Sequence, residues 1–166
     1  MPGENAQEIL STAPQRAAAL SCPQLGSRPR RGLAVLTCMD ARIDPLALLG
    51  LELGDAHVIR NAGGLVSDDA IRSLSASQRV LGTEEVIVVM HEGCGLLGAS
   101  DEDFAAALAA DGASPPWRLG AFADLDAAVL EGVERLRQAP ELVRRDRIRG
   151  FVFDPFTGSL REPLDG

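Results

Sequence analysis

Short runs of apolar residues alternate along this chain with longer stretches in which apolar residues recur every three or four positions. The short runs are rich in valine, isoleucine and phenylalanine and have the length of buried strands. The longer stretches have the spacing of helices with one apolar face. We predict strands over 33–37, 56–59, 86–90 and 148–153.

Helices are expected before and between these strands, because capping residues stand at the right places. Ser67 and Ser100 each precede acidic residues, as N-caps do, and Gly82 follows an apolar face, as glycine does where a helix ends. We predict helices over 4–20, in one or two pieces around Pro14, from Ser67 to Gly82, over 100–111 and over 121–138.

This alternation of strands and helices predicts the fold class. It is typical of an α/β fold with a doubly wound, mainly parallel sheet flanked by helices. The segment 149–160 has the pattern of a strand, a turn and a short return, which predicts an antiparallel C-terminal addition to the sheet.

Length and charge narrow the class of protein. The 166 residues suffice for one core, so we expect a single domain over 1–166, with residues 1–30 forming a separate helical arm. A net charge of -8 disfavours nucleic acid and anionic membranes as partners. We interpret the one basic cluster as a solvated helix end that leads into the last strand; it comprises Arg144, Arg145, Arg147 and Arg149.

The remaining composition bears on chemistry and compartment. The chain contains arginine but no lysine, which excludes a lysine nucleophile or a Schiff base. It shows neither a signal-peptide pattern nor a long apolar stretch, so a cytoplasmic protein is expected. In a reducing compartment, cysteines that lie among His and Asp are expected to be ligands or nucleophiles rather than disulfide partners. Cys22 lacks such neighbours and is interpreted as incidental.

Two segments that follow predicted strands hold the candidate chemistry. Cys38, Asp40 and Arg42 come after the first strand, and His91 and Cys94 come after the third. If these strands are neighbours, two thiolates and one imidazole meet at one edge of the sheet. This donor set suits zinc and leaves a fourth position open, where a bound water would have its pKa lowered to about 7.

Asp40 and Arg42 have two alternative roles beside such an ion. Residues two apart in an extended segment point the same way, so Arg42 can pair with Asp40 and lower its pKa. The carboxylate could then orient a zinc-bound water, or it could be the fourth ligand itself. Three plainer alternatives are an ordinary surface ion pair, a closed structural zinc site and a disulfide between Cys38 and Cys94.

These motifs resemble the β-class carbonic anhydrases in identity, order and spacing. The resemblance rests on Cys38-Met39-Asp40-Ala41-Arg42, on residues 54–64 and on His91-Glu92-Gly93-Cys94-Gly95, with a fainter echo in 150–160. It implies that Cys38, His91 and Cys94 bind Zn²⁺, that Asp40 and Arg42 are the catalytic dyad, and that Asp40 can be a fourth ligand. It also implies a sheet of order 2-1-3-4, which makes the first and third strands neighbours.

The resemblance further implies an assembly, and two residues depart from the family pattern. A homodimer or higher even-numbered homo-oligomer is expected, with residues 1–30 packed on a partner subunit. Met90 replaces the usual glycine before the zinc histidine, and the acidic Glu92 stands where a small or polar residue is usual. We expect Asn61 to Gly64 to form a loop close to the metal, with a plain turn as the alternative, and His57 to be a satisfied core or interface histidine.

The function that follows is zinc-dependent reversible hydration of carbon dioxide to bicarbonate through zinc-bound hydroxide, the reaction of a zinc carbonate dehydratase, which is a hydro-lyase. One alternative is hydrolysis of carbonyl sulfide or carbon disulfide at the same site. Another is a non-catalytic zinc or redox-thiol protein. In the first two cases the partner is a small-molecule substrate.

Overall fold

A five-stranded sheet organises the protein, whose computed structural model describes residues 4–164. The strand order is β2-β1-β3-β4-β5, and the first four strands are parallel while β5 runs antiparallel to β4. The predicted order and the antiparallel addition are therefore confirmed. The strands are β1 (Leu33–Cys38), β2 (Ala56–Asn61), β3 (Glu85–His91), β4 (Ile148–Asp154) and β5 (Ser159–Arg161).

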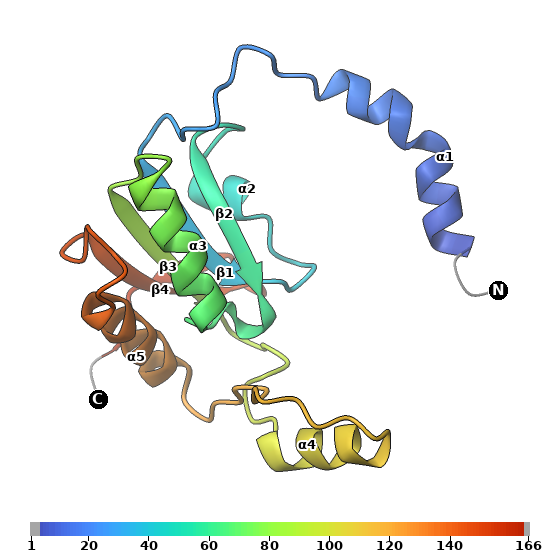
Figure 1. The fold of residues 1–166 in the computed structure, drawn as a ribbon, viewed down its shortest axis with the longest axis vertical. Coiled ribbons are helices and arrows are strands. Elements are labelled where there is room, and N and C mark those ends of the chain that lie inside the picture. The colour runs from blue at the N-terminus through green and yellow to red at the C-terminus, as the bar shows by residue number, and fades with distance from the viewer. Residues whose placement is uncertain (1–3, 165–166) are drawn as a thin grey trace.

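Helices cover both faces of this sheet, and side-chain alternation decides what each face packs against. Leu36, Val88 and Met90 point to one face, where they form the main core with α3 (Asp68–Arg79) and α5 (Leu125–Gln138). Val35 and Val89 point to the other face and pack near the short helix α2 (Pro45–Leu49). Figure 1 shows α3 and α2 on opposite sides of the sheet.

Two helices, α5 and α2, differ from the sequence predictions. The helix predicted from 121 begins at Leu125, because the Asp124 side chain caps it by accepting from the Ala127 N–H at 3.0 Å. Phe122 is thus outside the helix and forms a parallel bridge with Leu97. The unpredicted helix α2 has an Asp44 N-cap and a proline in its first turn.

Two helices stand away from the sheet (Figure 1). Helix α1 (Glu4–Ala19) is one helix that continues through Pro14, and it exposes Ile9 and Leu10. Helix α4 (Asp101–Ala110) has no buried residue. It belongs to an excursion over residues 99–121 that is closed at its base, where Gly98 N–H donates to the Phe122 carbonyl at 2.8 Å. None of the helices in residues 4–164 is long and apolar enough to cross a membrane.

Candidate metal centre

Three metal-ligating side chains meet at the carboxyl ends of β1 and β3. Cys38 is the last residue of β1, His91 is the last residue of β3, and Cys94 lies in the turn that follows. The two strands are parallel neighbours, so their ends lie at the same edge of the sheet. The three ligand atoms lie within 4.8 Å of one another, and all three residues are buried. The sequence prediction that Cys38, His91 and Cys94 converge is confirmed.

The hydrogen bonding of His91 leaves one ring nitrogen without a partner. Its Nδ1 lies 3.0 Å from the Glu92 carbonyl oxygen, so Nδ1–H donates there and the lone pair is on Nε2. Nε2 is buried and has no hydrogen-bond partner among the described residues. Buried polar atoms normally have a hydrogen-bond partner, so a free lone pair on this nitrogen is typical of an atom that ligates a metal ion. Two sulfurs and this nitrogen fit a zinc ion.

The environment of the Cys94 thiol disfavours its thiolate form unless a cation is present. Burial raises the pKa of the Cys94 thiol, and the neighbouring Cys38 thiol raises it further. Burial also lowers the pKa of His91, which keeps the imidazole neutral and able to ligate. A bound dication reverses this preference at the sulfurs, because a coordinating thiol loses its proton.

Asp40 and Arg42 form a two-pronged ion pair beside the triad. Arg42 Nη2 lies 2.7 Å from Asp40 Oδ2, and Arg42 Nε lies 2.9 Å from Oδ1, which also accepts from the Arg42 backbone N–H at 2.9 Å. These bonds hold the pKa of Asp40 well below its usual range. Asp40 Oδ2 is 3.8 Å from His91 Nε2. The carboxylate therefore stands at the open side of the triad while its oxygens are bonded to Arg42.

A backbone contact that the sequence only partly indicated supports Cys38. The turn after β2 contains the 3-10 helix η1 (Ala62–Gly64), in which Gly64 has a φ of +68°. A Cβ on Gly64 would lie 3.0 Å from the Cys38 backbone nitrogen. The expected close approach of this loop is thus observed, and it is made to the backbone of the first cysteine.

Arg60 is a supporting residue that the sequence reasoning missed. Its Nε donates to the Cys38 carbonyl at 3.0 Å, and its Nη2 donates to the Asp40 carbonyl at 2.7 Å. The feature of the sequence that could have indicated this role is the position of Arg60 near the end of β2, where it pairs in register with Thr37. Arg60 therefore fixes the backbone on both sides of Met39, between the first cysteine and the carboxylate.

Glu92, which departs from the family pattern, is paired away from the three ligands. Its carboxylate lies 3.4 Å from Arg161 Nη2, and Arg161 also binds Asp126 at the start of α5, with an Nη2–Oδ2 distance of 3.0 Å. Its backbone N–H donates to the Phe153 carbonyl at 2.8 Å. Glu92 thereby ties the turn that holds Cys94 to β4, β5 and α5.

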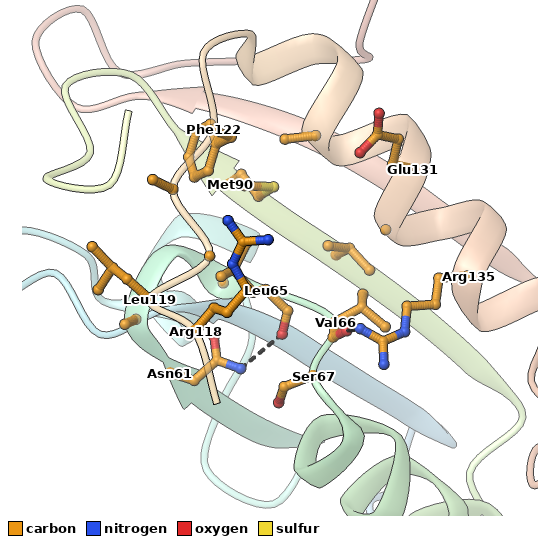
Figure 2. A pocket seen from close by; sticks show the side chains of 17 residues that line it. Asn61, Leu65, Val66, Ser67, Met90, Arg118, Leu119, Phe122, Glu131 and Arg135 are labelled. Carbon is orange, nitrogen blue, oxygen red and sulfur yellow. Dashed lines mark hydrogen bonds between the residues drawn. The ribbon is translucent and has the colours of Figure 1, made fainter. Parts of the chain in front are cut away.

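A pocket of about 480 Å³ lies on the face of the sheet that α5 covers, between β3, α5 and the segments around Leu65 and Leu119 (Figure 2). Met90 contributes to its floor, and Arg118 reaches over it. Its lining includes neither the triad nor the ion pair of Asp40 and Arg42. The candidate reactive side chains thus lie outside this pocket.

The other residues noted in the sequence have structural environments. His57 Nδ1 is 2.7 Å from Ser77 Oγ, and Nε2 is 2.9 Å from the Ser27 carbonyl oxygen, so this histidine is satisfied as predicted. The arginine cluster is exposed, but it does not belong to a helix end, because α5 stops at Gln138. The polypeptide instead turns before β4, where Arg147 pairs with Glu84 at 3.0 Å.

Comparison with known proteins agrees with this geometry. A family model described as carbonic anhydrase matches residues 33–117. β-Carbonic anhydrase 1 of Mycobacterium tuberculosis is 44% identical over 135 residues, which cover 81% of this chain and 83% of that protein. A carbon disulfide hydrolase of Acidianus is 37% identical over 158 residues, covering 80% of this chain and 78% of that protein.

A solved structure extends the likeness to the whole fold. The crystal structure of a carbonic anhydrase from Streptococcus mutans matches with a TM-score of 0.88 and 33% identity, covering 99% of this chain and all of that one (100%). The matched family segment contains the triad and the ion pair of Asp40 and Arg42. The chain therefore belongs to the β-carbonic anhydrase family.

Proposed function

We propose that this protein catalyses the zinc-dependent, reversible hydration of carbon dioxide to bicarbonate, as a zinc carbonate dehydratase. The observation that carries the proposal is the buried triad of Cys38, His91 and Cys94, in which His91 Nε2 has no hydrogen-bond partner within residues 4–164 and lies beside an ionised Asp40. The identity of 44% to β-carbonic anhydrase 1 of M. tuberculosis supports the same chemistry.

The triad would hold the ion, and the neighbouring side chains would act on the reacting water. Zinc held by Cys38, His91 and Cys94 would supply a Lewis acid that lowers the pKa of water to about 7. Asp40 stays ionised at neutral pH because Arg42 holds its pKa low, so it accepts a hydrogen bond and does not donate one. Asp40 would in this way orient the attacking water. In the alternative role, Asp40 would turn from Arg42 and ligate the ion.

The surroundings of the triad suit an uncharged substrate. Cys38 and Cys94 belong to a buried apolar cluster with Ile43, against which Leu48, Leu96 and Phe153 pack among others. Such a wall offers little to a charged ground state but accepts a small, linear, apolar molecule. Arg42, which is partly exposed, is a positive group beside the triad, where it could stabilise negative charge that develops.

Hydrolysis of carbon disulfide or carbonyl sulfide is the second candidate. The similarity of 37% identity to a carbon disulfide hydrolase from Acidianus favours it, because that likeness also spans most of both proteins. These substrates share the linear shape and low polarity of carbon dioxide. The triad and Asp40 would have the same roles with any of the three substrates.

We also propose a homodimer or higher even-numbered homo-oligomer in which residues 1–30 pack on a partner subunit. Helix α1 supports this assembly, because it stands apart from the sheet of its own subunit and exposes Ile9 and Leu10 (Figure 1). The expected compartment is the cytoplasm, where a reducing environment keeps Cys38 and Cys94 available for the ion.

The decisive experiment compares carbon dioxide hydration with carbon disulfide and carbonyl sulfide hydrolysis on zinc-loaded protein. Asp40→Asn should lower kcat/KM roughly 10²–10⁴-fold on the preferred substrate. Asp69→Asn is the matched control, because it breaks another pair of aspartate and arginine, with Arg72, on the exposed surface of α3. Cys94→Ala should lose stoichiometric zinc.

The possible outcomes separate the candidates. Higher kcat/KM on carbon dioxide supports the first proposal, and higher kcat/KM on a sulfur substrate supports the second. Equal activity of Asp40→Asn and Asp69→Asn would show that Asp40 has no catalytic role. Purified wild-type protein that binds no zinc would point instead to a redox-thiol protein.

A further inference from the structure

Phe156 is an exposed aromatic residue that lies against the catalytic pair. Its side chain is 75% exposed, yet the ring lies over the guanidinium of Arg42, with 5.5 Å between Arg42 Cζ and the ring centroid. At this distance the electron-rich face of the ring attracts the cation. This large apolar side chain is left open to water, yet it makes a specific contact with Arg42.

The turn between β4 and β5 holds the ring in this place. The Asp154 carboxylate accepts from the Phe156 backbone N–H at 2.8 Å and from Thr157 Oγ1 at 2.6 Å. Gly158 N–H donates to the Asp154 carbonyl at 2.8 Å, which closes the turn. The ring position is thus set by a hydrogen-bonded turn.

The ring also lies against the turn that carries Cys94. Gly93 has a φ of +64°, and a Cβ there would lie 3.2 Å from Phe156 Cε2 and 3.8 Å from Arg42 Nη1. The Gly93 carbonyl accepts from Arg42 Nη2 at 3.0 Å. The ring, the guanidinium and the Gly93 backbone are therefore packed together, and the absence of a side chain at Gly93 makes room for them.

Arg42 depends on such support because its hydrogen bonds come from one edge only. Nε and Nη2 bind Asp40, and Nη2 also reaches Gly93, whereas the described hydrogen bonds include none from Nη1. A long side chain held along one edge can swing away in water. The Phe156 ring covers a face of the guanidinium and restricts that movement.

We propose that Phe156 is a positioning residue that keeps Arg42 paired with Asp40, so that the carboxylate faces the reacting water and does not become a fourth ligand. This role deepens the proposed function and rests on it. Without the ring, Arg42 holds Asp40 less firmly, and the carboxylate occupies the fourth position of the metal more often.

The test uses three variants of the full-length, metal-loaded protein. Phe156→Leu removes the aromatic face and keeps an apolar side chain, whereas Phe156→Trp keeps a π face. Phe151→Leu is the matched control, because it removes the pair that Phe151 forms with Arg149, at 4.9 Å, away from the dyad. The first readout is kcat and KM on the preferred substrate, and the second is the Kd of azide for the cobalt-substituted protein, measured by visible absorption.

Phe156→Leu should lower kcat about twofold to fivefold with little change in KM, and should weaken azide binding by a similar factor, in the range that exposed cation–π contacts span. Phe156→Trp should restore both values, and Phe151→Leu should match wild type in both. Wild-type values in Phe156→Leu, or equal losses in Phe156→Leu and Phe156→Trp, would overturn the proposal. If the wild-type protein hydrates or hydrolyses none of the substrates, the proposed function fails, and the azide measurement alone decides the role of Phe156.

Discussion

Replacing Gly64 by alanine tests how closely the turn after β2 must approach Cys38, the first candidate metal ligand. Alanine would have to adopt a φ near +68°, which costs about 1–2 kcal/mol for an L-residue. Its Cβ would also lie 3.0 Å from the Cys38 nitrogen and 3.1 Å from the Thr37 carbonyl carbon and the Val89 oxygen. These are backbone atoms of β1 and β3, which cannot rotate away as a side chain could, so overpacking adds about 1–3 kcal/mol.

We therefore expect Gly64→Ala to lower the free energy of unfolding by about 2–5 kcal/mol, as measured by urea denaturation of the zinc-free protein. Gly50→Ala separates the two causes, because Gly50 has a φ of +62° but nothing lies within 4 Å of the position of its Cβ. This control should lose only the strain part, about 1–2 kcal/mol. Zinc affinity should also fall in Gly64→Ala, since Cys38 must shift. Equal stability losses in the two variants, with zinc affinity unchanged, would refute the close-approach argument.

Three further predictions concern acid, metal and packing. Asp126→Asn should destabilise the protein at pH 7 but hardly at pH 2. Arg161 lowers the pKa of Asp126 in the folded state. The stabilisation that Asp126 gives is therefore present above its unfolded pKa of about 4 and is lost as the pH falls through its lower folded pKa. Urea midpoints across pH check this, with Asp146→Asn in the exposed turn before β4 as control; a parallel loss at all pH values contradicts it. A chelator added to protein that is kept at a free zinc concentration of 100 times Kd should lower the free energy of unfolding by about 2.7 kcal/mol, which is measured as a lower melting temperature. An unchanged melting curve would argue against a zinc site. Gly150→Ala should lower the free energy of unfolding by about 1–3 kcal/mol in the same urea denaturation, because its Cβ would press on Val129 and lie 2.9 Å from Val133 Cγ2 of α5. Wild-type stability of this variant would mean that α5 can shift to make room.

The meeting of the metal ligands was predictable because it follows from strand order. Apolar runs place Cys38 and His91 at the ends of β1 and β3, and parallel strands bring their carboxyl ends to one edge of the sheet. Cys94 then follows within a tight turn whose glycine, Gly93, has a left-handed φ of +64°. These steps depend on local pattern or on a general rule of sheet topology, whereas the adjacency of β1 and β3 was an expectation from the resemblance to the β-class carbonic anhydrases, which the strand order confirms.

The supporting residues were harder to predict because their contacts join segments that are distant in sequence. Arg60 supports the carbonyls of Cys38 and Asp40 from β2, and Phe156 reaches Arg42 from the turn after β4. Neither contact leaves a periodic or compositional signal. The start of α5 was misplaced for a related reason: Phe122 fits the apolar stripe of a helix, but its backbone instead pairs with Leu97.

The excursion that carries α4 leaves the body of the protein and returns to it at almost the same point. Leu97 and Phe122 are bridged, and a second bond, from Phe122 N–H to the Leu96 carbonyl at 3.2 Å, closes the base beside the turn of Cys94. Helix α4 itself buries no residue. Its length and sequence are consequently free to change while the reacting groups stay in place, so this segment offers a site at which a graft, a tag or an evolutionary insertion could give the protein a new surface and leave its chemistry intact.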